Sequence, residues 1–148
     1  MVTIAEICDG IANTLSTASG IKTTKSYDQL SEGIPATDCP RLQVYPDSFV
    51  QDVRQATDRT AFSGSIRQSQ LTIFVDVYAR QRSHLALDVA AMVDTLDSLI
   101  DVLEAEERPP FFGVKGVRSF RWEWRRAVLR YGDKRYAGGR FTLWLQIY

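Results

Sequence analysis

The stretch QLTIFVDVYAR, residues 70–80, alternates from one residue to the next between two kinds of position. One set is aliphatic throughout: Leu71, Ile73, Val75 and Val77. The other set is more polar: Thr72, Phe74, Asp76 and Tyr78. A period of two is typical of a β-strand with one face turned to a hydrophobic core. We therefore predict a strand here, the most regular one in the chain, and expect the other elements to pack around it.

Two helices are predicted before and after this strand. Thr3 and Glu6 form a capping box, and apolar residues recur at three- and four-residue spacing over residues 3–18. A longer helix is predicted from about His84 to Glu107, with Ser83 as its N-cap. Its apolar stripe consists of Leu85, Val89, Met92, Leu96, Leu99, Ile100 and Leu103. Its polar face is acidic and carries Asp88, Asp94, Asp97, Asp101 and Glu104.

The segment before the central strand divides into a short strand and a loop. Residues 41–45 alternate and predict a short strand, and Pro46 is expected to end it because proline cannot donate to a sheet ladder. Residues 47–65 follow neither a strand nor a helix period. We predict a long mobile loop there, since long connections in compact domains are usually functional or mobile.

The C-terminal part, residues 114–148, predicts a two-stranded β-ribbon. In its first strand Phe120, Trp122 and Trp124 share one face, and we expect a bulge or sharp bend at residues 125–127. The segment GDKRYAGG joins the two strands, and its glycines, Gly138 and Gly139, are expected to form the turn.

These elements predict one domain over residues 1–148, of the α+β class. We expect a mostly antiparallel sheet of about four strands, with the N-terminal helix and the long helix packed on one face.

Lysines and arginines number 18 and so do aspartates and glutamates, which argues against a protein that mainly neutralises phosphates. No apolar run reaches the roughly 20 residues of a membrane span, so we expect no membrane partner. Cys8 and Cys39 are predicted to be reduced thiols.

Catalytic motifs are missing from the sequence. His84 is the only histidine, and no nucleophile elbow or phosphate-binding loop accompanies it. Asp94, Asp97 and Asp101 share a helix face, but no histidine lies among them, so a solvated or partner-facing acidic stripe is the better interpretation. We predict no catalytic residues, no metal site, no cofactor and no enzyme activity. A small enzyme that uses His84 is the weakest alternative.

Charge is segregated between the long helix and the ribbon. Nine of the 18 cations lie between Lys115 and Arg140, whereas residues 84–107 contain acids and no lysine or arginine. Three interpretations follow: the two elements neutralise each other within one subunit, they meet between copies, or the ribbon contacts DNA through its arginines and tryptophans. The candidate subunit-interface residues are Arg121, Arg125, Arg126 and Arg130 on the ribbon, and Asp94, Asp97 and Asp101 on the helix.

The order of these pieces resembles a known family. The resemblance rests on the helix TIAEICDGIANTL, the segment SYDQLSEGIPATDCPRLQVYP, the long loop, the strand LTIFVDVYAR, the helix ALDVAAMVDTLDSLIDVL and the closing ribbon. Together they are similar to the tail terminator, or tail completion, proteins of long-tailed bacteriophages. The resemblance covers nearly the whole chain and lies in element order and length, because that family has no catalytic motif.

The resemblance implies a structural protein of the virion, assembled in the host cytoplasm and located in the tail or neck. It implies a hexameric ring at the head-proximal end of the tail tube, which ends tube growth and offers the head-docking surface. The implied partners are other copies of the chain, the tail tube protein, the head–tail connector protein, and genomic DNA passing through the ring without sequence recognition. The alternatives are a head–tail connector or head-completion protein of the neck, and a nucleic-acid-binding module that uses the basic ribbon.

Overall fold

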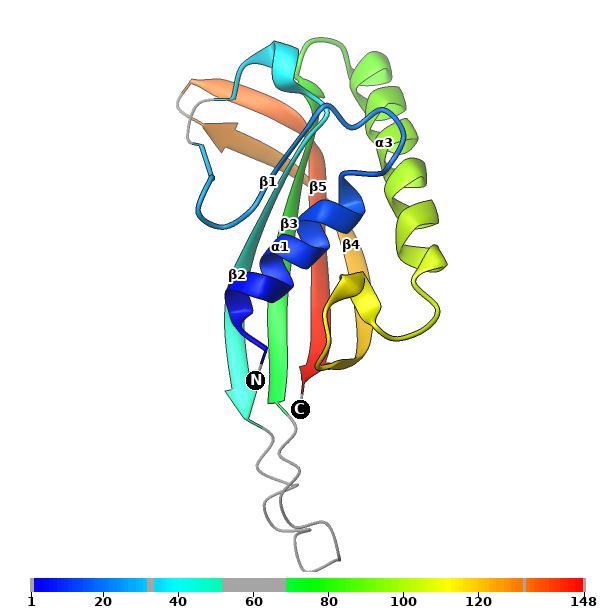
Figure 1. Cartoon of the computed structure of the whole chain (residues 1–148). Helices are drawn as coiled ribbons and strands as arrows, with labels where there is room; N and C mark the ends of the chain where they lie inside the picture. Colours follow the sequence, from blue (N-terminus) through cyan, green and yellow to red (C-terminus); the bar gives the residue numbers. More distant parts are fainter. Residues whose placement is uncertain (1, 32–33, 52–68, 132, 148) are drawn as a thin grey trace, which may run out of the picture.

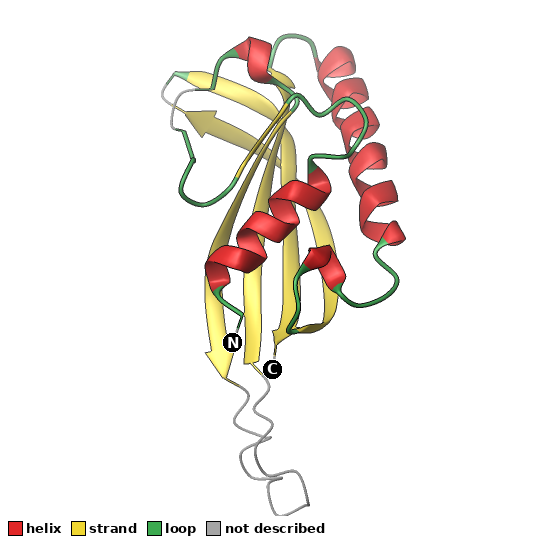
Figure 2. Ribbon diagram, viewed as in Figure 1, coloured by secondary structure: helices red, strands yellow, loops and turns green. Residues whose placement is uncertain are grey.

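The computed structural model describes residues 2–31, 34–51, 69–131 and 133–147. It shows the predicted α+β class, and the described residues form two helices and a mostly antiparallel sheet (Figures 1 and 2). In chain order the elements are α1 (Ile4–Leu15), β1 (Thr23–Lys25), the 3-10 turn η1 (Ala36–Asp38), β2 (Arg41–Gln51), β3 (Ser69–Gln81), α3 (Leu85–Ala105), the 3-10 turn η3 (Phe111–Gly113), β4 (Val117–Tyr131) and β5 (Lys134–Ile147).

The five strands lie in the order β1-β2-β3-β5-β4. Only β1 and β2 run parallel, and the other three pairings are antiparallel. The predicted central strand, β3, is paired along both of its edges, with β2 on one side and β5 on the other. The sequence predicted about four strands, and the fifth is the three-residue β1.

Both helices cover the same face of the sheet, as Figure 2 shows. The predicted alternation of β3 is confirmed, because Leu71, Ile73, Val75 and Val77 are all buried against the helices. The capping box is also present: Glu6 accepts from the Thr3 backbone amide at 2.7 Å, and the Thr3 hydroxyl accepts from the Glu6 amide. Trp122 belongs to this core and packs on Phe141, with ring centroids 5.6 Å apart.

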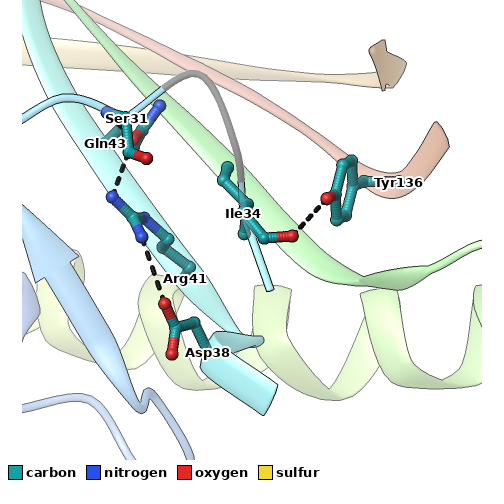
Figure 3. Close-up of polar contacts among 6 residues, drawn as sticks. All are labelled: Ser31, Ile34, Asp38, Arg41, Gln43 and Tyr136. Carbon is teal, nitrogen blue, oxygen red and sulfur yellow. Dashed lines mark hydrogen bonds and ion pairs between the residues drawn. The ribbon is translucent and has the colours of Figure 1, made fainter. Parts of the chain in front are cut away.

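A second, smaller core lies on the opposite face of the sheet. There the segment 34–39 crosses over the strands and buries Ile34 and Cys39 against Tyr78 and Tyr136. The Tyr136 hydroxyl donates to the Ile34 carbonyl oxygen, as Figure 3 shows. Polar contacts also form under this segment. Arg41 is buried and donates to Asp38 at 3.3 Å and to Gln43 at 3.1 Å (Figure 3).

The prediction that Pro46 ends its strand was wrong. β2 continues through Asp47 to Gln51, and its pairing with β3 shifts register between Pro46 and Ser48. The sheet tolerates this proline because β1 pairs only with Arg41–Gln43, so β2 is an edge strand at Pro46. The predicted loop 47–65 is therefore strand up to Gln51, and its remainder lies outside the described residues.

The prediction for residues 125–127 offered a bulge or a sharp bend. β4 and β5 keep one continuous register from Ser119 to Tyr131, so the bulge is absent, whereas the ribbon does bend in Figure 1. The turn predicted at the two glycines was wrong. Gly138 and Gly139 lie inside β5 and not in the turn. A Cβ atom on Gly138 would lie 1.8 Å from the Val77 carbonyl oxygen, so glycine is required there for close approach of two strands.

The long helix differs from the prediction at its beginning. His84 and not Ser83 is the N-cap residue, and its side chain makes no capping hydrogen bond. Leu85, predicted in the apolar stripe, is 62% exposed, whereas Asp88, predicted on the polar face, is 3% exposed. Asp88 is buried because Arg80 Nε approaches its carboxylate to 3.3 Å and the Ser83 amide donates to it at 3.2 Å. These contacts fix the start of α3 to the end of β3.

Neither α1 nor α3 combines the length and the apolar character that a membrane-spanning helix needs; this finding covers the described residues.

The close approach at Gly138 makes a stability prediction. Gly138→Ala forces the Val77 and Gly138 backbones apart and should lower the free energy of unfolding by about 3 kcal/mol, as overpacking does in rigid interiors. Urea unfolding followed by circular dichroism measures the change. Gly113→Ala is the control: its φ is +69° but nothing lies within 4 Å, so only about 1 kcal/mol of backbone strain is expected. Equal losses would contradict steric crowding at Gly138.

Candidate functional site

Among the described residues, one face of the sheet is covered by the helices, and the other is covered at its upper end, in the view of Figure 1, by segment 34–39 and by Ser31, whose amide donates to the buried Gln43 at 3.0 Å. We call the rest of this second face the open face. Strand register places its residues in rows across the sheet: Asp76, Arg140 and Arg125; Tyr45, Phe74, Thr142 and Glu123; Ser48, Thr72, Trp144 and Arg121. The open face is therefore built from polar and aromatic side chains.

A three-residue network lies at the centre of the open face. Asp76 is 3% exposed and accepts hydrogen bonds from Arg140 Nε and from the Tyr45 hydroxyl, both at 2.7 Å. Arg140 also donates to the Tyr45 oxygen at 3.0 Å and lies 4.4 Å over the ring of Phe74. The hydrogen bond to Asp76 raises the pKa of the Arg140 guanidinium. The opposite charges of Arg140 and Asp76 are paired inside the subunit.

Two of the predicted interface arginines, Arg121 and Arg125, lie on the open face. Arg121 is exposed, and its guanidinium carbon lies 4.4 Å from the centre of the Trp144 ring. Arg125 donates to Glu123, two residues away on the same strand. That contact raises the pKa of Arg125. Arg121 is thus held by a cation–π contact, which leaves its N–H donors to bind another molecule.

The other two arginines, Arg126 and Arg130, are exposed on the opposite side of β4, because residues an odd number of positions apart alternate across a strand. Arg126 lines a shallow depression between β4 and the first half of α3. Leu85 and Val128 line it too and are 62% and 47% exposed. The four arginines predicted as one set are therefore divided between two faces.

The predicted acidic partners, Asp94, Asp97 and Asp101, are all exposed on α3. None of them makes an ion pair with a described residue, and Arg121, Arg126 and Arg130 make none either. Within the described residues the helix and the ribbon therefore do not neutralise each other by direct ion pairs. The exposed charge of both elements is available to other molecules.

The structure brings no catalytic group together among the residues that it describes. His84 is exposed at the start of α3, and no cluster of three or more histidine, cysteine, aspartate or glutamate residues forms there. Both cysteines are buried, and burial raises the pKa of the Cys8 thiol to about 11 and also raises that of Cys39. The described surfaces offer docking chemistry, through charge, aromatic rings and apolar side chains.

Sequence reasoning missed the network of Tyr45, Asp76 and Arg140. One signal for it was present: Asp76 stands between two valines in the strand predicted to be central, where an ionised carboxylate needs a partner. The partner could not be identified, because Arg140 is adjacent to Asp76 only through the pairing of β3 with β5.

A comparison with protein-family models finds no match for this chain, and a comparison with curated proteins finds none at a significant level. Its function has to be inferred from the surfaces described above.

The buried carboxylate allows a direct test of the network. Asp76→Ala removes the acceptor of two short hydrogen bonds and leaves the guanidinium of Arg140 unpaired, which should cost about 2–3 kcal/mol of unfolding free energy. Asp97→Ala makes the same chemical change at an exposed helix position and should shift stability by less than about 0.5 kcal/mol. Urea titrations of both variants provide the comparison, and similar values would show that the network does not stabilise the fold.

Proposed function

We propose that this protein is a structural subunit of a phage tail, which forms a ring at the head-proximal end of the tail tube, ends tube growth and offers a docking surface to the head. Other copies of the chain, the tail tube protein and the connector protein are its partners. Genomic DNA passes through the ring without sequence recognition. The virion is its place of action.

One observation carries this proposal. Asp94, Asp97 and Asp101 of α3 and the arginines of β4 are exposed, and no ion pair joins them among the described residues. A surface that carries opposite charges at two separate places can join copies head to tail, and such contacts close into rings. The order of elements adds support, because it resembles the tail terminator family over nearly the whole chain.

A second candidate is a nucleic-acid-binding module, and the Arg121–Trp144 pair favours it. An arginine stacked on an exposed aromatic ring offers both a cation to phosphate and a flat surface to bases. Such binding weakens steeply as salt rises, because it depends on counterion release. A ring interface with an apolar centre persists in moderate salt.

Charge reversal on the helix side of β4 tests the ring. Arg126→Glu with Arg130→Glu should leave thermal melting within a few degrees of wild type, since both side chains are exposed. The ring population should fall at least tenfold, because the ribbon would repel the acids of a neighbouring α3. Reversal at Asp94 and Asp97 to lysine should partly restore it. Native mass spectrometry at several concentrations, with and without tail tubes, measures the outcome.

The matched control is Arg121→Glu with Arg125→Glu, which makes the same change on the open face. Under the ring proposal this variant keeps Arg126 and Arg130 for the acids of α3, so its ring population should fall less than that of Arg126→Glu with Arg130→Glu. Under the nucleic-acid alternative it loses salt-sensitive retention on DNA. A wild-type chain that stays monomeric at millimolar concentration and also with tail tubes would overturn the proposed function.

A further inference from the structure

β4 forms one border of the sheet and presents an unusually long open edge. Its 15 residues pair with β5 on one side, and no described strand pairs with the other side. An edge of this length leaves a row of backbone N–H and C=O groups available to another strand. Natural proteins usually shorten or cover such edges, so an edge that stays open is a candidate pairing surface.

The opposite border is open over the second half of β2. β1 pairs only with Arg41–Gln43, so the outer edge of residues 44–51 has no described partner strand. This half also exposes two large apolar side chains, which no described element of the same copy covers: Phe49 is 52% exposed and Val50 is 58% exposed. Side chains of this size on a strand edge are expected where a further strand covers them.

The directions of the two open edges are compatible. β2, β3, β5 and β4 are joined by three successive antiparallel pairings, so β4 runs opposite to β2. A ring whose axis follows the strands keeps the same strand direction in every copy. The β4 edge of one copy therefore meets the β2 edge of the next in antiparallel orientation, which continues the existing pattern.

The two open edges also span the same rows of the sheet, and both carry apolar side chains. Strand register places Phe49 in one row with Phe120, Pro46 with Trp122, and Val44 with Trp124. On the helix side, the exposed Phe49 of one copy would thus meet the half-buried Phe120 and Trp122 of its neighbour. Pairing would bury apolar side chains from both edges.

Charge selects between two ways of pairing. A two-fold dimer through β4 alone would also be antiparallel, but it would bring Arg121, Arg125, Arg126 and Arg130 of two copies together. Like charges at that density oppose pairing. Residues 44–51 of β2 contain Asp47 and no lysine or arginine, so the β2 edge accepts the arginine-rich strand without repulsion.

From these observations we propose that a second copy of this chain occupies each edge: β4 residues 117–124 of one subunit pair with β2 residues 44–51 of the next. The sheet then continues from subunit to subunit around the ring. This inference rests on the proposed ring and specifies the contact that closes it.

Disulfide trapping tests the contact. Residues opposite each other on paired strands have Cα atoms about 4.5–5.5 Å apart, which a disulfide can bridge. Val50→Cys with Ser119→Cys places thiols in one row on the open face. Val50→Cys with Arg121→Cys tests a pairing in which the two strands are shifted by two residues. The native thiols should not interfere, because both are buried. Mild oxidation of assembled protein should give a covalent ladder up to the closed ring on a denaturing gel, and wild type should give none.

The outcomes separate this contact from the ring itself. A ring seen by native mass that yields no ladder with either pair overturns the edge contact and leaves the proposed function standing. Covalent dimers from Ser119→Cys alone would show β4 paired with β4 and also overturn it. No ring in any condition would refute the proposed function, and the edge contact with it.

A substitution gives an independent measurement. Phe49→Arg should reduce the ring population at least tenfold without changing thermal melting, because Phe49 is half exposed in one subunit. Leu30→Arg replaces another half-exposed apolar residue, outside both segments proposed to pair, and should assemble normally. Assembly that resists Phe49→Arg would overturn the edge contact.

Discussion

The pairing of β3 with a strand along each edge is the interaction on which the rest of the structure depends. It aligns the aliphatic face of β3 with those of β2 and β5 and creates one continuous apolar surface. α1 and α3 bury their apolar sides on that surface. Because short helices are marginal alone in water, their stability comes mainly from this packing. The same pairing brings Asp76 beside Arg140 on the other face.

Periodic local patterns predicted much of this fold from the sequence. The alternation in residues 70–80, the Thr3–Glu6 capping box and the helical stripe over α3 each depend on neighbours close in the chain, and the α+β class that they predicted is confirmed. The errors arose where a distant strand decides the conformation. Pro46 is tolerated because β1 stops short of it, and the Gly138 position is constrained by the Val77 carbonyl oxygen.

The candidate site shows the same limit. Composition identified a run of arginines on the ribbon, but two of them face one way and two the other, since consecutive positions of a strand alternate. Sequence also assigned Asp88 to the exposed acidic stripe. Arg80 and Arg82 bury it instead, because the end of β3 returns beside the start of α3. Charge runs predict that a surface is polar, and topology decides which charges remain exposed for a partner.

Edge pairing between copies would also determine what each face of the sheet meets. β-pairing preserves faces, so in such a ring the open faces of all copies lie on one side of a continuous sheet and the helices on the other. The helical layer is bulkier and fits the larger outer circumference, which leaves the open face toward the lumen. There Arg125 and Arg140 already have acidic partners, and Arg121 is held by the Trp144 ring alone. A lumen with most of its arginines balanced in this way would hold a polyphosphate chain only weakly, since strong retention requires an excess of unpaired cations.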